Sequence, residues 1–463
     1  MSLKTNFFNN HFSNDFFHFS AVILLSVFPL LFFLGTGMVN LSVIILDIIF
    51  ISEILIKKRL NFLKNYIFYS LIFLWFTFLI NIFFSIDSSN SFSRGFGFIR
   101  FIFFVMLILY YFNINNEKYR KIILYTWLVI FSITSLDLIF EYINGKNILG
   151  FTSYIHGRLA GFFNDELIIG HFYYAFILII TSFLIVIFSN KKLNIVNKEY
   201  DLKNFIYLFL FLFLLISFLI GERSNFSKVF IMVLLFSFLF EKKLFKLKVI
   251  LFSLFFITIF LIINSNHKWK TRFLDQYIYH YLQNPIKNIF NSVHGGHYLT
   301  ALEIYDNNKI FGVGFKNYPI ELQKRKYMKK RELKAMERYL VNPDKPKLFK
   351  IDKGSKASYV KGHIFYYWER GGPSTHAHQV HFEFLAELGL FGYFSLMIFF
   401  IFHFYKFIRK KNFNTSLNLS GLLFVFTSLL PLLPSGSFFT SHTATLFWMN
   451  FAFMCLNQKE LKL

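Results

Sequence analysis

The sequence predicts an all-α polytopic membrane protein with about twelve transmembrane helices and one large loop between the ninth and the tenth. Three observations support this fold class. Hydrophobic residues make up 55% of the 463 positions, far more than a soluble fold of this length needs to fill its core. They gather in runs long enough to cross about 30 Å of hydrocarbon as helix. A transmembrane barrel would need alternating strands of about ten residues, a pattern that the sequence lacks.

These runs divide the chain into three parts. The first nine predicted helices occupy residues 1–264, the large loop occupies 265–384, and the last three helices occupy 385–463. The predicted spans lie near 20–37, 38–56, 65–86, 96–113, 121–140, 167–189, 204–221, 225–240, 248–264, 385–405, 415–433 and 441–457. We expect no cleaved signal peptide, because the residues before the first span lack a small-residue cleavage pattern.

Basic residues predict the orientation of the spans. They cluster after every even-numbered span, and positive charge in short loops favours the cytoplasmic side. The clusters are Lys57, Lys58, Arg59 and Lys64; Lys118, Arg120 and Lys121; Lys191, Lys192 and Lys198; Lys242, Lys243, Lys246 and Lys248; and Arg409, Lys410 and Lys411. Both termini are therefore predicted in the cytoplasm, and the large loop on the outer side. This placement explains the net charge of +24 without nucleic acid as a partner.

Two further features bear on the chemistry. The only cysteine, Cys455, lies in the last apolar run, so neither a disulfide framework nor a thiolate metal site is available. Within the large loop, residues 321–340 are predicted to form a strongly basic helix. This helix is either a solvated face or a contact with anionic headgroups or a phosphate-bearing glycan.

The segment 375–392 is the richest in candidate functional groups. It reads T-H-A-H-Q-V-H-F-E-F-L-A-E-L-G-L-F-G, with three histidines and two glutamates where the large loop enters the tenth span. If the helix begins after the second histidine, Glu383 and Glu387 share one face, and Gly389 and Gly392 allow close helix packing. Ionisable groups at membrane depth are costly and need a reason to persist. The segment predicts a catalytic site, a structural cap or, without thiolate or H-E-x-x-H support, a metal site.

Three further motifs precede this segment. They are I-F-G-V-G-F-K-N-Y at 310–318 in the large loop, R-L-A-G-F-F-N at 158–164 in an earlier outer segment, and G-E-R-S at 221–224 at an outer helix boundary. With the segment 375–392, these motifs resemble, in order and spacing, those of the O-antigen ligase and polymerase superfamily, and most closely those of the ligases. In that family the G-V-G stretch stands early in a large periplasmic loop and the histidine signature ends it.

The resemblance implies a fold and an activity. The fold would be of the C-type glycosyltransferase kind, in the bacterial inner membrane with its active site facing the periplasm. The activity would be transfer of a preassembled glycan from polyprenyl diphosphate, with neither a cofactor nor a necessary metal and with inversion at C1. In lipopolysaccharide biosynthesis a ligase delivers the glycan to lipid A-core, whereas a polymerase joins it to a growing glycan. Transfer to a protein hydroxyl is a third activity of the family, and the histidine spacing favours ligation.

The resemblance and the charge of the substrate together assign the catalytic residues. Arg158 and Arg223 are predicted to hold the diphosphate, because each guanidinium donates two parallel charge-assisted hydrogen bonds and both residues lie at the outer boundary. The alternative for each is an interfacial cation. His378 is predicted to take the proton of the acceptor hydroxyl as general base, with His376 as its less favoured substitute.

The remaining candidates are assigned to substrate binding. Glu383 is an orienting partner for the imidazole, and Gly312 and Gly314 belong to the G-V-G motif. The chain departs from the family at 165–166, where Asp-Glu replaces the common Pro-Asn, and at His297, which stands closest to the place of a frequent family arginine. Two other classes stay open. A lipid-linked sugar transporter would have paired broken helices with polar residues at the midplane, and a scaffold would tolerate loss of the histidine base.

Overall fold

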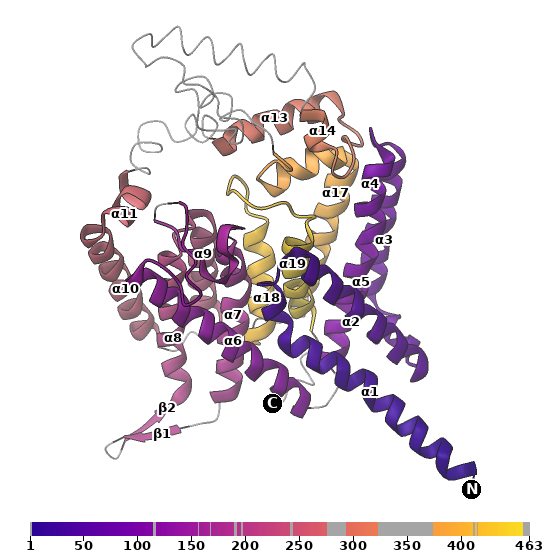
Figure 1. The fold of residues 1–463 in the computed structure, drawn as a ribbon, viewed down its shortest axis with the longest axis horizontal. Coiled ribbons are helices and arrows are strands. Elements are labelled where there is room, and N and C mark those ends of the chain that lie inside the picture. Colours follow the sequence, from indigo (N-terminus) through magenta and orange to yellow (C-terminus); the bar gives the residue numbers. More distant parts are fainter. Residues whose placement is uncertain are drawn as a thin grey trace.

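The computed structural model describes residues 2–113, 117–155, 157–166, 168–188, 192–195, 198–240, 244–275, 293–322, 374–410, 413 and 415–456. This part of the chain is a helical bundle with one short β-hairpin (Figure 1). The predicted basic helix at 321–340 lies outside the described residues apart from its first two positions. Much of the large loop and several of the lysines that predict orientation also lie outside the described residues.

Each of the predicted apolar runs overlaps a helix. These helices are α1 (Ser2–Leu31), α2 (Thr36–Ile56), α3 (Tyr66–Phe83), α5 (Ile99–Asn113), α6 (Glu117–Asn144), α7 (Ile169–Phe188), α8 (Leu202–Leu219), α9 (Arg223–Leu239), α10 (Phe245–Ser265), α17 (Val380–Arg409), α18 (Ser416–Ser428) and α19 (Ser441–Cys455). Two predicted boundaries are wrong. The first helix begins well before residue 20, and α18 stops before 433 because Pro431 and Pro434 lack the backbone N–H that would continue it.

Seven helical stretches in the described part of the chain are long and apolar enough to cross a membrane. They are Thr36–Ile56, Tyr66–Phe83, Ser88–Asn113, Lys118–Asn144, Ile169–Phe188, Phe245–Ser265 and Val380–Arg409. Large apolar side chains on their outer faces are exposed, among them Phe73, Phe83 and Phe260. Because water does not favour such a surface and lipid does, the predicted all-α multi-pass membrane protein is confirmed at this level.

The two ends of the bundle carry different elements (Figure 1). Helices α13 (Val293–Asn307) and α14 (Tyr318–Leu322) lie at one end, over the beginning of α17. At the other end lie both termini and the antiparallel hairpin of β1 (Lys192–Ile195) and β2 (Lys198–Asp201), which pairs Lys192 with Asp201. The described part of the large loop and the hairpin that carries Lys192 and Lys198 therefore lie at opposite ends.

Helix α17 is interrupted at Gly389, whose φ of 63° and ψ of −165° are not helical. Four backbone hydrogen bonds of 2.7 to 2.9 Å join residues 386–391 to 309–314 around this break. A Cβ on Gly389 would lie 2.4 Å from the carbonyl oxygen of Ile310, and one on Gly312 would lie 2.5 Å from a backbone carbon of α17. Both positions require glycine because the two backbones touch. The close packing expected at Gly389 is thus made with the G-V-G loop.

The third glycine of this contact, Gly314, meets a different neighbour. A Cβ there would lie 2.1 Å from the Cβ of Ser85 and 2.6 Å from the Oγ of Ser91. Gly312 and Gly314, predicted as substrate contacts, are therefore accounted for by packing that positions the start of α17. Their contact with substrate stays a prediction.

Candidate functional site

Four histidines meet where the large loop enters α17. His376 and His378 come from the segment before the helix, and His294 and His297 lie one turn apart on α13. The ring centroid of His378 lies 4.1 Å from that of His376, 4.7 Å from that of His297 and 5.2 Å from that of His294. The predicted base, its predicted substitute and the predicted site residue at position 297 are therefore brought together, and His294 joins them.

The backbone around His378 places its imidazole beside the helix entrance. Its φ of 56° lies in the left-handed region, which a non-glycine residue adopts only when neighbours hold it there. On one side its carbonyl accepts a 2.8 Å hydrogen bond from the amide of Ser435. On the other, Gln379 caps α17 by accepting from two amides of the first turn, at 2.8 and 3.1 Å. The helix thus begins at Val380, directly after the cap.

Burial and repulsion from neighbouring positive groups keep the imidazoles of His376 and His378 uncharged. Burial lowers the pKa of His378 well below its ordinary value, and the neighbouring histidines lower it further. The pKa of His376 falls to about 4, chiefly by burial and then by the charge of Arg94. A neutral imidazole has a free nitrogen lone pair, which a general base requires. The Nε2 of His378 lies 3.1 Å from the hydroxyl of Ser374.

The third histidine of the segment has a different environment. The Nε2 of His381 lies 2.7 Å from the carbonyl oxygen of Leu429, and its Nδ1 lies 3.2 Å from the hydroxyl of Tyr393. Both ring nitrogens are therefore engaged by the protein itself, one by the residue that follows α18 and the other by a residue of α17, which gives this histidine a packing role.

Glu383 does not contact the imidazole that it was predicted to orient. Its fully buried carboxylate accepts hydrogen bonds from the hydroxyl of Ser437 and, at 2.8 Å, from the amide of Phe438. It holds the segment that follows α18, and the amide of Ser435 in that segment bonds the carbonyl of His378. Any effect of Glu383 on His378 therefore acts through the backbone, because the carboxylate is saturated by other donors.

The predicted arginines lie together with a third. The Nη2 of Arg158 lies 3.2 Å from a carboxylate oxygen of Glu222, and Nη1 of Arg223 donates to the carbonyl of Arg272 at 3.4 Å. The Nε of Arg272 in turn donates to the carbonyl of Gly221. Burial, followed by the charges of Arg223 and Arg158, lowers the pKa of Arg272 to about 10. Three guanidinium groups thus lie close together, with Arg158 paired to Glu222, and an anion would relieve their repulsion.

Close backbone contact assembles this arginine cluster, defined as Arg158, Arg223 and Arg272. A Cβ on Gly221 would lie 1.8 Å from the carbonyl oxygen of Gly157, so the turn between α8 and α9 requires glycine to approach residue 158. The amide of Leu159 also donates to the carbonyl of the residue before that glycine, at 3.0 Å. Two motifs far apart in the sequence therefore meet through their backbones.

Residues 434–435 connect the arginine cluster to the histidines. The carbonyl of Pro434 accepts hydrogen bonds from the hydroxyl of Ser224 and, at 3.1 Å, from the ammonium group of Lys228. The next residue bonds the backbone of His378. On the other side, desolvation and the charge of Arg223 lower the pKa of His294. The two groups of side chains are therefore joined through one segment, and Arg223 lies near enough to His294 for its charge to act on that ring.

Sequence reasoning missed three residues of this site: His294, Arg272 and Arg94. His294 precedes His297 by one helical turn, a spacing that could have indicated a shared face. Arg272 stands eight residues after the ninth predicted span, where the sequence does not distinguish it from a charge that flanks a membrane helix. Arg94 pairs with Glu387 at 3.7 Å, a contact between distant parts of the chain. Among the described residues, no group of three or more His, Cys, Asp or Glu side chains is arranged to hold a metal ion.

No protein-family model matches the sequence, and no curated protein matches it significantly.

Proposed function

We propose that this protein is an O-antigen ligase-like glycosyltransferase of the bacterial inner membrane. It would move a preassembled glycan from polyprenyl diphosphate to a hydroxyl of lipid A-core. The observation that carries the proposal is the meeting of uncharged histidines with the arginine cluster at one end of a bundle of membrane-spanning helices. An anion-binding group and a proton acceptor within one site are what displacement of a diphosphate by an alcohol requires.

The position of the site along the helices supports an active site that faces the periplasm. Helix α8 begins directly after the hairpin that carries Lys192 and Lys198 and ends before Gly221, so Arg223 lies at the opposite end of the bundle from those lysines. With the hairpin in the cytoplasm, the arginines reach the outer headgroup level. A lipid-linked diphosphate arrives at that level. In this orientation the proposal keeps twelve spans and a periplasmic loop at 265–384.

The proposed reaction is a single displacement at the anomeric carbon. Arg158, Arg223 and Arg272 bind the diphosphate and stabilise the charge that develops on it as its bond to C1 breaks. An acceptor hydroxyl forms the new bond to C1 from the opposite face, and its proton passes to His378. The polyprenyl diphosphate leaves with the electron pair of the broken bond. Attack from the opposite face inverts the configuration at C1.

The break in α17 does not favour the transporter alternative. Broken helices in transporters leave backbone groups that coordinate a substrate or an ion near the midplane. Here the backbone groups of residues 386–391 around Gly389 are bonded to residues 309–314 of the large loop. They serve to attach the loop to the helix.

The experiment that tests the proposal is the analysis of lipid-linked glycans in a strain that lacks this protein. A missing ligase leaves full-length glycan on the polyprenyl diphosphate, whereas a missing polymerase leaves single repeat units. Polymerisation is the second candidate, because the same site chemistry serves both acceptors. Accumulation of neither species would reject both, and restoration by a His378→Ala gene would favour a scaffold.

A further inference from the structure

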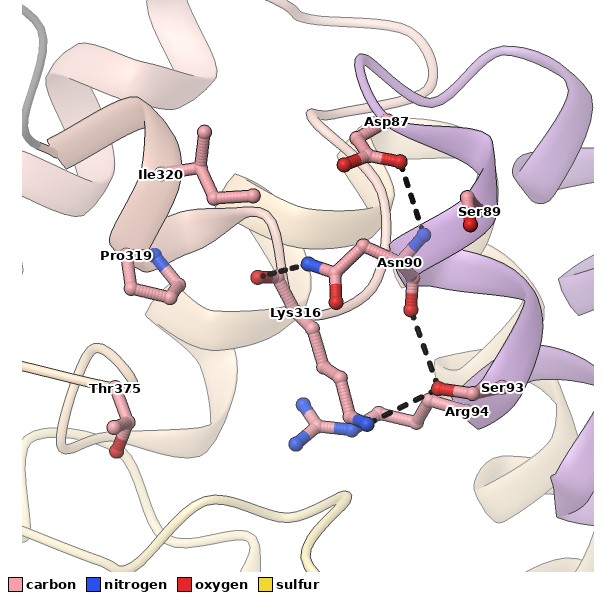
Figure 2. Close-up of a pocket in the computed structure, with 9 residues that line it drawn as sticks. All are labelled: Asp87, Ser89, Asn90, Ser93, Arg94, Lys316, Pro319, Ile320 and Thr375. Atoms are coloured by element: carbon pink, nitrogen blue, oxygen red, sulfur yellow. Dashed lines mark hydrogen bonds between the residues drawn. The ribbon is translucent and has the colours of Figure 1, made fainter.

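A second cationic site lies on the other side of the histidines, in a cavity of ≈ 770 Å³ (Figure 2). It is formed by α4 (Ser88–Gly95) and the residue before it, by Lys316 in the loop after the G-V-G motif, by α14 and by the segment before α17. Its lining residues are Asp87, Ser89, Asn90, Ser93, Arg94, Lys316, Pro319, Ile320 and Thr375. Several of them are exposed, so the cavity opens to the surroundings of the protein. A cavity of about 300–1,000 Å³ is typical of a small-molecule site.

Two positive charges line this cavity. Figure 2 shows the side chains of Arg94 and Lys316 close to each other, on neighbouring walls. The ammonium group of Lys316 donates to the hydroxyl of Ser93 at 3.1 Å. Nη1 of Arg94 lies 3.7 Å from a buried oxygen of Glu387, too far for a hydrogen bond. Burial and then the charges of Arg94 and Arg100 lower the pKa of Lys316. An anion between the two cations would offset this repulsion.

The rest of the lining suits a hydroxylated ligand. Asp87 accepts a 3.0 Å hydrogen bond from the amide of Asn90 with one carboxylate oxygen, and its other oxygen faces the cavity in Figure 2. Ser89 and Thr375 are exposed on opposite walls. Side chains with carboxylate and hydroxyl oxygens can accept from and donate to sugar hydroxyls. Polar lining beside two cations therefore favours an acidic saccharide over an apolar molecule.

The cavity adjoins the histidines. Thr375 precedes His376 directly, and the charge of Arg94 contributes to the lowered pKa of that histidine. On the other side of the cluster, the charge of Arg223 acts on His294. The imidazoles therefore lie between two cationic regions that share no residue. A two-substrate transfer needs a separate binding region for each substrate, with the proton acceptor between them.

We propose that this cavity binds an anionic sugar of the acceptor glycan, with its carboxylate or phosphate held by Arg94 and Lys316. The inference rests on the proposed function and deepens it, because it assigns one cationic region to the donor diphosphate and the other to the acceptor. The acid group is shared chemistry between a uronic acid and a sugar phosphate. Binding in this cavity would direct a neighbouring hydroxyl of the acceptor towards His378.

The test is binding of four probes to the purified full-length protein in detergent: methyl glucuronide, glucose 6-phosphate, methyl glucoside and inorganic phosphate. We expect one of the two acidic sugars to bind at least about tenfold more tightly than the neutral sugar and than inorganic phosphate. Which acid binds identifies the acceptor chemistry. Lys316→Gln should weaken that binding by about tenfold, because it removes the half-buried charge but keeps a polar side chain.

Matched variants make the test specific. Lys309→Gln removes an exposed lysine of the same loop outside the cavity and should leave binding unchanged. Ser89→Trp should block the cavity from its rim without removing a charge. His378→Ala should retain probe binding while it loses transfer, so failure of the reaction and failure of the cavity are distinguishable. Equal binding of neutral and acidic sugars, equal binding of inorganic phosphate, or no effect of Lys316→Gln would overturn the proposal.

Discussion

The two cationic regions beside the histidines are built differently. In the arginine cluster, two guanidinium groups bond backbone carbonyls, and the carboxylate of Glu222 that pairs with Arg158 is partly exposed, with 23% of its side chain accessible. In the cavity, Arg94 faces the fully buried Glu387, while the second cation is Lys316 on a flexible stem. A guanidinium held by backbone contacts offers N–H donors in fixed directions, whereas an ammonium group on a flexible stem can move to meet its ligand.

This difference suits the two substrates of the proposed reaction. In the proposed reaction the diphosphate is the same in every donor molecule. Guanidinium groups held in fixed positions can therefore match its oxygen atoms. An adaptable cation in an open cavity suits a proposed acceptor whose acid group need not occupy one fixed position. The histidines lie between the two regions, and substitutions on each side should separate their roles.

The largest expected effect follows substitution of the histidine that lies between the two regions. His378→Ala removes the proposed base and should lower transfer of a lipid-linked glycan by roughly 10² or more. The spans and the arginine cluster do not depend on this ring, so expression in the membrane should persist. The measurement is turnover by the purified variant in detergent with chelator present.

His381→Ala is the matched control, because both nitrogens of His381 are already bonded within the bundle. We expect a smaller loss of turnover with some loss of thermal stability. Near-normal turnover by His378→Ala would reject the general-base role. Loss of wild-type turnover on addition of chelator would indicate a metal instead.

A smaller but clear loss should follow Arg158→Lys and Arg223→Lys. Each change keeps the charge but removes the fork, so transfer should fall by well over about tenfold while the protein stays in the membrane. Arg272→Lys should act in the same direction. Arg409 is exposed at the far end of α17, so Arg409→Lys is the control for replacing an arginine with a lysine outside the cluster. Full activity of all three cluster variants would leave these arginines as interfacial anchors and would contradict their proposed role in binding the donor diphosphate.

The smallest expected effect is that of pH on turnover. Because the pKa of His376 is about 4 and that of His378 is lowered as well, both rings stay neutral from pH 6 to 8, and the rate should stay nearly flat there. Stability should behave differently. Below the ordinary histidine pKa of about 6.5, these histidines bind protons in the unfolded chain but stay unprotonated in the folded site. The melting temperature in detergent should therefore fall from pH 7 to pH 5. A rate that halves near pH 6.5 would show a charged imidazole instead.

The helices and the residue types of the site could be predicted from the sequence. Apolar runs depend on neighbouring residues alone, and so does the cap that starts α17 at Val380, one position from the expected start. Contacts between distant residues could not be predicted in this way. Glu383 lies four residues from Gln379 and one turn from the histidine that it was expected to orient, yet its carboxylate bonds Ser437 and Phe438, far along the chain.

By itself, the sequence determined that this chain is a helical membrane protein and that polar side chains gather where its large loop enters α17, because composition and periodicity are local properties. Only the tertiary structure decided which charges share a site. Arg158, Arg223 and Arg272 meet because the backbones of Gly221 and Gly157 touch, and the histidines of α13 reach His378 because Gly312 and Gly389 allow the loop to lie against the helix. Such close approaches depend on long-range packing, and a sequence pattern reveals the glycines without naming their partners.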